Sequence, residues 1–210
     1  MTLGRASIRP QLGALLLEVP MIRAPILLAA TALAATLTAG DFGPVARLAT
    51  EAFPGRTHFG VVCDYGRSAE AVNDLARSLP DHANLTVIDA RIPDHIAVAA
   101  AKLVLSEVEM LAILPHDALV RDGSPYATRL VGRVNQLNPS ILAFGTTPEA
   151  LKNGCAFALG EKTGWALMVN QGDSRVRGVL ENYTIGPSSE KTSSLSGQSS
   201  VTVRVISMGR

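Results

Sequence analysis

A short run of apolar residues, 110–114, constrains the fold of this chain more than any other feature. The run reads MLAIL, and Pro115, His116 and Asp117 follow it directly. Apolar runs of this length that end in a turn are typical of strands buried on both faces of a parallel sheet. Polar residues just beyond the carboxyl end of such a strand lie where open α/β sheets bind their ligands. We therefore expect the central strand of an α/β domain here, with its exit loop facing a site.

The segments on both sides of this run alternate between strand-like and helix-like patterns. Further strands are predicted at 58–63, 84–90, 140–144 and 155–159, and helices within 41–53 and at 69–79, 95–105, 125–137, 148–153 and 164–170. The expected N-caps of the three longer helices are Ser68, Asp94 and Ser124. Strands that alternate with helices of about 10–15 residues indicate parallel βαβ units. The prediction is therefore an α/β fold with a parallel five-stranded, doubly wound, flavodoxin-like sheet.

Residues 1–40 differ in composition from the rest of the chain and form an N-terminal extension. The stretch 24–39 carries no charge, Arg23 precedes it, and small residues follow at 38–40. This order is typical of a secretory signal peptide, here at about residues 21–39, and it predicts a periplasmic or exported protein. The run is short for a membrane span, which needs about 20 residues. An alanine-rich core helix of a cytoplasmic protein has nearly the same composition and stays the alternative.

The α/β lobe is expected at 41–171, and residues 172–210 form a C-terminal extension. Within it, residues 186–200 are rich in Ser and Gly, which is typical of a flexible loop. Residues 201–206 read VTVRVI, alternate strictly and have high strand propensity. This strand is expected to pair with a sheet edge of this chain or of a neighbour.

Charge and motif content argue against several classes of protein. The net charge is +1 and the 19 basic residues are scattered, so no nucleic-acid surface is expected. The loop 64–68 matches neither GxGxxG nor GxxxxGK[ST], so no nucleotide cofactor is expected. Cys63 and Cys155 fit no zinc spacing, and neither do the histidines, so no metal site is expected.

Polar residues from several strand ends would meet at one rim of a parallel sheet. The candidate ligand-binding residues are Asp64, Tyr65, Ser68, Pro115, His116, Asp117, Thr146 and Thr147. Helix N-termini at Ser68 and near Pro148 would add backbone donors and a partial positive charge. Such a rim suits a carboxylate or another small polar organic ligand, with Tyr65 stacked on its apolar part.

The pair His116 and Asp117 comes nearest to catalytic chemistry, because histidine beside a carboxylate can act as an acid or base. Neighbours in a chain rarely pair with each other, however, and no serine or cysteine nucleophile has a recognisable elbow. Cys63 is a poor nucleophile, since the adjacent Asp64 raises the pKa of a thiol. We therefore expect a non-enzymatic protein with no catalytic residues.

Several short motifs occur in a familiar order. They are Phe53-Pro54-Gly55 before the first strand, the loop 65–68, the turn Leu114-Pro115-His116-Asp117, the strand and loop 141–147, and the segment 151–156. In this order, residues 53–170 resemble the C-terminal lobe of ABC-transporter substrate-binding proteins of the tryptophan/tyrosine-binding type. The resemblance implies a periplasmic-binding-protein-like lobe and a small ligand bound between two lobes. Residues 1–52 are too short to form the first lobe.

Three functions stay open. The first is a periplasmic small-molecule-binding protein related to transporter components, with cleavage near Ala39 and a second subunit that completes the cleft. The second is a structural protein that uses the lobe as an oligomerisation scaffold, with the strand 201–206 added to the sheet of a second copy. The third is a cytoplasmic flavodoxin-like enzyme with a bound cofactor.

Overall fold

The computed structural model describes residues 42–160, 166–170, 172–173, 175–176 and 201–208. All of them belong to one compact unit, Ala39–Arg210. The predicted signal peptide at 21–39 and the Ser/Gly-rich stretch 186–200 lie outside the described residues. In the described part of the chain, no helix is long and apolar enough to cross a membrane.

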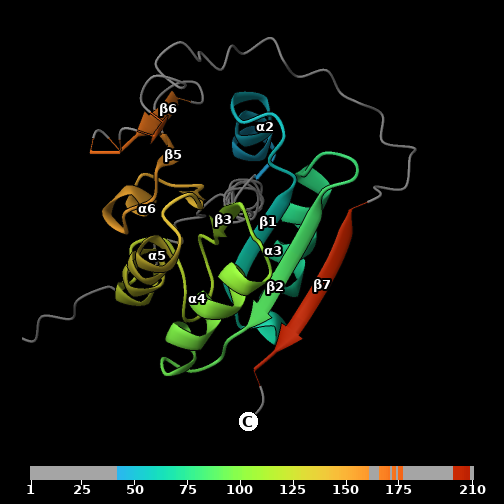
Figure 1. The fold of residues 1–210 in the computed structure, drawn as a ribbon, viewed down its shortest axis with the longest axis vertical. Helices are drawn as coiled ribbons and strands as arrows, with labels where there is room; N and C mark the ends of the chain where they lie inside the picture. The colour runs from blue at the N-terminus through green and yellow to red at the C-terminus, as the bar shows by residue number, and fades with distance from the viewer. Residues whose placement is uncertain (1–41, 161–165, 171, 174, 177–200, 209–210) are drawn as a thin grey trace, which may run out of the picture. The chain divides into compact units, whose positions relative to one another are not determined.

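The fold is α/β, with a mostly parallel sheet of seven strands in the order β6-β5-β4-β3-β1-β2-β7 (Figure 1). The strands are β1 (His58–Cys63), β2 (Asn84–Asp89), β3 (Met110–Ile113), β4 (Leu142–Gly145), β5 (Phe157–Gly160), β6 (Ala166–Val169) and β7 (Thr202–Ser207). Only the pairing of β6 with β5 is antiparallel among these neighbours. The sheet thus has two strands more than the five predicted for the lobe.

Helices cover both faces of the sheet. They are α2 (Phe42–Ala52), α3 (Tyr65–Ser78), α4 (His95–Leu105), α5 (Pro125–Leu137) and α6 (Glu149–Lys152). Residues of α2 and α3 pack in one hydrophobic cluster, and residues of α4, α5 and α6 pack in a second. Met110 and Ala112 of β3 face the first cluster, whereas Leu111 and Ile113 face the second. Because both faces are covered, β3 is apolar at every position, as the sequence predicted.

Two local predictions were wrong. Residues 166–169 form strand β6 rather than a helix, because they pair with the otherwise free edge of β5. Helix α3 begins at Tyr65, with Asp64 at the N-cap position, so Ser68 lies inside the helix. Carboxylates from distant loops accept hydrogen bonds from the backbone N–H groups of Asp64 and Tyr65, which makes a local cap unnecessary.

The other two predicted caps differ in outcome. Ser124 accepts a hydrogen bond from the Ala127 backbone N–H, with Pro125 at the start of α5, so this cap is confirmed. Asp94 stands at the N-cap position of α4, but its side chain makes no capping hydrogen bond. The Asp94 backbone is already helical there, with φ −68° and ψ −20°, instead of the extended conformation that favours a side-chain cap.

Candidate functional site

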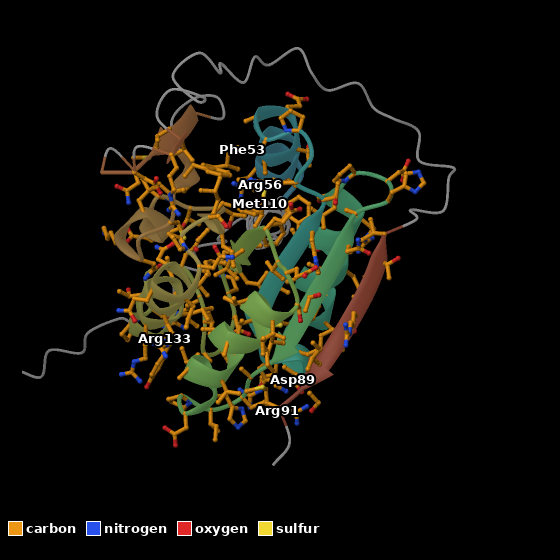
Figure 2. All side chains as sticks on the ribbon, viewed as in Figure 1. Phe53, Arg56, Asp89, Arg91, Met110 and Arg133 are labelled. Atoms are coloured by element: carbon orange, nitrogen blue, oxygen red, sulfur yellow. The ribbon has the colours of Figure 1, made fainter. Side chains whose placement is uncertain are left out.

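The centre of the sheet contains a point where the strand order reverses. β1 and β3 are neighbours, and the chain continues from β1 to β2 on one side and from β3 to β4 on the other. Open α/β sheets hold their ligands outside the carboxyl ends of the strands at such a point. Figure 2 shows Asp89 and Arg91 at this carboxyl end and Phe53 and Arg56 at the opposite end of the sheet. We call the carboxyl-end segments 64–68, 89–91 and 115–122 the rim, which includes the start of α3 and the end of β2.

Asp117 joins the exit loops of the two central strands. Its Oδ2 accepts hydrogen bonds from the backbone N–H of Asp64 at 2.9 Å and from the Ser68 hydroxyl at 2.7 Å. Its Oδ1 accepts from the backbone N–H groups of Leu119 at 2.8 Å and Val120 at 2.6 Å. The residue is 1% exposed. A carboxylate offers about four acceptor positions, so Asp117 holds the loops in place instead of facing a ligand.

Asp89, at the end of β2, makes a second link across the rim. Its Oδ1 accepts from the Tyr65 backbone N–H at 3.1 Å, and its Oδ2 accepts from Arg91 Nη2 at 2.8 Å. The hydrogen bond from Arg91 is the largest cause that lowers the pKa of Asp89. Two of the first donors of α3 are therefore engaged by Asp89 and Asp117. The sequence predicted that this helix end adds backbone donors to the rim, and the donors of Asp64 and Tyr65 are already used by these two carboxylates.

Two arginines beside Asp64 carry exposed positive charge at the rim, and Arg121 of the β3 loop is exposed as well. The side chains of Arg67 and Arg91 are 77% and 57% exposed. Arg67 Nε lies 3.5 Å from Asp64 Oδ2, and Arg91 Nε lies 3.9 Å from Asp64 Oδ1. Asp64 itself is half-buried, and the half-buried ring of Tyr65 packs beside the α2 and α3 cluster. This part of the rim thus presents both signs of charge, and Tyr65 follows Asp64 directly in the chain.

The predicted residues of the β3 loop have different environments. Pro115 is half-buried and His116 is exposed, whereas Asp117 is buried. Both oxygens of Asp117 receive their hydrogen bonds from other residues, so the carboxylate does not orient the imidazole of His116. The arrangement that an acid–base pair requires is therefore not formed by His116 and Asp117.

Thr146 and Thr147 belong to a neighbouring group of contacts around Asp122. The backbone N–H and the hydroxyl of Thr147 donate to Asp122 Oδ2 at 3.1 and 2.8 Å. Burial raises the pKa of Asp122 to about 6, although the bonds from Thr147 lower it. The Thr146 Oγ1 and Asp122 Oδ1 atoms are buried without a hydrogen-bond partner in the described structure. Asp122 therefore joins the β4 loop to the β3 loop, as Asp117 joins the β3 loop to the β1 loop.

Sequence reasoning missed Asp89, Arg91 and Asp122 as rim residues. Asp89 was counted as the end of a strand, and Asp122 as part of a turn. A signal was present, because Asp89 follows the apolar residues of β2 just as Asp64 follows those of β1. A charged residue in this position at the end of a buried strand predicts a rim contact.

Two cavities lie at the opposite, amino end of the sheet. One has a volume of about 390 Å³ and is lined by Arg56, Val104, Glu107, Val108, Glu109, Asn138 and Ser140. Arg56 Nη1 donates to the backbone oxygens of Glu109 and Ser140, both at 2.8 Å. Glu109 Oε2 accepts from the backbone N–H groups of Thr57 and His58. The side chains of Arg56 and Glu109 thus bond to backbone groups near the amino ends of β1, β3 and β4.

The second amino-end cavity, of about 450 Å³, is lined by Asn135, Gly154, Asn170, Gly172, Asp173 and Arg175. Arg175 Nη1 donates to the backbone oxygens of Pro139 and Ile141, and its guanidinium pairs with Asp173. Its charged group is therefore also engaged in contacts within the chain.

Both cysteines are buried and free. Burial raises the pKa of the Cys63 and Cys155 thiols, and the carboxylate of Asp117 raises that of Cys63 further. Thiolates are the reactive form, so neither residue has the environment of a nucleophile. Within the ranges that the structure describes, no group of three or more His, Cys, Asp or Glu side chains could hold a metal ion.

Comparison of the chain with protein-family models, with curated proteins and with solved structures gave no match. Its function is therefore inferred from the geometry of the rim.

Proposed function

We propose that this protein is a non-catalytic binding module with a flavodoxin-like or periplasmic-binding-protein-like lobe, and that its rim receives a small polar organic ligand. The observation that carries this proposal is the position of Asp117. This residue ties together the exit loops of β1 and β3, which flank the point where the strand order reverses. Loops that are fixed before binding lose less conformational entropy when a ligand arrives.

The charges around Asp64 favour a ligand that carries both an anionic and a cationic group. Arg67 and Arg91 are exposed and can donate to a carboxylate, which a guanidinium group can bind through two parallel hydrogen bonds. Asp64 lies between them and can accept from an ammonium group. An amino acid has this chemistry, and an aromatic side chain would add contact with the ring of Tyr65. The resemblance to tryptophan- and tyrosine-binding proteins points to the same class.

The uncharged stretch 24–39 supports export of the chain, with a mature N-terminus near Asp41. A second subunit that covers the rim would complete a cleft around the ligand. The mass of the intact protein from a cell that exports it tests the first point. A chain that keeps residues 1–40 would argue against export.

Thermal unfolding with L-tryptophan and L-tyrosine as probes tests the binding site. A ligand at a hundred times its Kd stabilises the folded state by about 2.7 kcal/mol, which raises the Tm of a chain of this size by roughly 5–10 °C. We expect Tyr65→Ala to abolish this increase. Tyr126→Ala is the matched control, because Tyr126 is also half-buried but lies on α5 beneath the guanidinium of Arg129.

Two results would contradict the proposal. One is the absence of any increase in Tm with both amino acids and with a wider panel of small zwitterions. The other is an equal loss of the increase in Tyr65→Ala and Tyr126→Ala, because the effect would then not originate at the rim.

A further inference from the structure

Strand β7 forms an outer edge of the sheet (Figure 1). It pairs with β2 in parallel, from Asn84 opposite Thr202 to Asp89 opposite Ser207. The strand predicted at 201–206 therefore joins a sheet edge of its own chain. No described residue pairs with the other side of β7. An edge strand of this kind is open to addition of a further strand.

The backbone groups of β7 that face away from β2 can be identified from one hydrogen bond. The Thr202 N–H donates to the Ala83 backbone oxygen at 3.1 Å, so the backbone groups of Thr202 face β2. Because these groups alternate along a strand, those of Val203, Val205 and Ser207 face outward. The Val203 and Val205 side chains are 41% and 42% exposed. The outer edge thus combines two exposed valines with backbone groups that pair with none of the described residues.

β7 has few of the features by which natural edge strands avoid pairing. Its register with β2 is regular over all of its residues, without a bulge. It contains no Pro and no Lys, and Arg204 is its only charged residue. Bulges, prolines and lysines are the common means of blocking an exposed edge. The regular backbone of β7 therefore favours a specific strand partner.

We propose that the partner is the β7 strand of a second copy of this chain, paired antiparallel across a two-fold axis. Such an axis runs perpendicular to the sheet, so residues opposite each other lie on the same face of their sheets. Centring the axis on Val205 aligns Val205 with its own copy and Val203 with Ser207. All three residues have outward backbone groups, so they form the hydrogen-bonded pairs of an antiparallel ladder.

Charge repulsion favours the register centred on Val205 over the register centred on Arg204. Centring the axis on Arg204 would place two arginines directly opposite each other, which destabilises a strand pair. Centring it on Val205 places Arg204 opposite Ile206 instead. The register centred on Val205 also pairs residues 202–208 with the second copy. An axis on Val203 would pair only residues 201–205 of the described strand. The proposed interface lies along the outer edge of β7, on the side away from β2, and does not depend on the ligand proposed above.

Disulfide formation by a single introduced cysteine tests the register in the full chain. The residues of a hydrogen-bonded antiparallel pair have Cα atoms about 5.5 Å apart, which is within the range of a disulfide. Val205→Cys should therefore give a covalent dimer under mild oxidation, since the native Cys63 and Cys155 are buried. Thr202→Cys is the control, because its copies lie far apart in this register. Cross-linking at Val203→Cys in place of Val205→Cys would overturn the register.

Sedimentation of the full chain over a range of concentrations tests the assembly itself. We expect a dimer, and we expect Val205→Lys to weaken it by roughly fivefold or more, because two like charges then face each other. Val98→Lys is the control, since Val98 on α4 is 50% exposed and lies outside β7. A wild-type monomer at all concentrations would overturn the proposal, as would an unchanged Val205→Lys dimer. If Val205→Lys fails to fold by circular dichroism, the cysteine variants decide.

Discussion

The Ser68 hydroxyl donates a hydrogen bond to Asp117 Oδ2 at 2.7 Å, and both residues are buried. Ser68 belongs to α3, which follows β1, whereas Asp117 belongs to the loop that follows β3. The two residues are 49 positions apart in the sequence. This contact and the one from the Asp64 backbone N–H to the same oxygen set the spacing between the two central exit loops.

We predict that Asp117→Ala lowers the free energy of unfolding by roughly 2–4 kcal/mol. The reason is that four donors lose their acceptor, and a buried donor without a partner costs about 1–3 kcal/mol. Ser68→Ala removes a single hydrogen bond and should cost roughly 0.5–1.5 kcal/mol. Urea unfolding of both variants measures the difference. A cost for Asp117→Ala no larger than that for Ser68→Ala would contradict the role given to this carboxylate.

The same Asp117→Ala variant separates the two proposed surfaces. Loss of the loop spacing should weaken binding of the amino-acid probes, because the loops are no longer held for the ligand. The size of the dimer should stay the same, because β7 pairs through residues at the edge of the sheet. If Asp117→Ala binds the amino-acid probes with the affinity of the wild type, the rim is not the binding site.

The fold was largely predictable because its signals are local. The order of apolar runs and amphipathic helices gave β1 to β5 and α2 to α6, with their ends displaced by a few residues. The segment 166–169 was predicted incorrectly as helical, because its structure depends on the free edge of β5. Its four residues are too few for their spacing to distinguish a helix from a strand.

The contacts of the rim were less predictable because they connect distant positions. Asp89 bonds to the Tyr65 backbone 24 positions away, and Asp122 bonds to Thr147 25 positions away. A carboxylate after a strand can bind a ligand or a neighbouring loop, and the sequence pattern is the same in both cases. Asp117 was therefore correctly placed at the rim but interpreted as a ligand contact.

We predict opposite effects for alanine at two glycines. A Cβ atom at Gly145 would lie 2.3 Å from Ala150 Cβ and 2.7 Å from Asp122 Oδ1. Gly145→Ala should therefore destabilise the protein by roughly 1–3 kcal/mol or more, because the packed helix α6 has to move. Gly132 lies on the exposed side of α5 with nothing within 4 Å of its Cβ position. Gly132→Ala should stabilise the protein by roughly 0.5–1 kcal/mol, because alanine favours a helix.

Thermal or urea unfolding of both glycine variants checks this prediction. A Gly145→Ala protein as stable as the wild type would show that α6 can move without lowering the free energy of unfolding. A destabilised Gly132→Ala protein would show that this position of α5 is covered.

We predict that neither cysteine reacts with a thiol reagent while the protein is folded. Both side chains are buried, and burial raises the pKa of both thiols, so little thiolate is present at neutral pH. Labelling with a thiol reagent should reach both sites only after urea is added, and intact mass counts the labels. Rapid labelling of Cys63 in the native protein would show that the rim opens, because Cys63 lies directly before Asp64 at the end of β1.

The carboxyl of Asp122 makes stability depend on pH. Burial raises its pKa to about 6, whereas a free aspartate has a pKa of about 3.9. Between these two values the unfolded chain has released a proton that the folded chain still holds. Stability therefore falls as the pH rises through this window. The stabilising effect of the protonated carboxyl is complete below about pH 4, and it is lost above about pH 6.

We predict that Asp122→Asn removes this dependence. The asparagine oxygen can still accept from Thr147, but the side chain no longer titrates. The stability of the variant relative to the wild type should rise by roughly 2–3 kcal/mol from about pH 4 to about pH 6 and stay constant outside this range. Urea unfolding at a series of pH values measures it, with Asp81→Asn in an exposed loop as the control for loss of one carboxyl. A relative stability that does not change between about pH 4 and about pH 6 would contradict this prediction. The Asp122 carboxyl would then ionise as readily in the folded chain as in the unfolded one, and water would reach its buried Oδ1 atom.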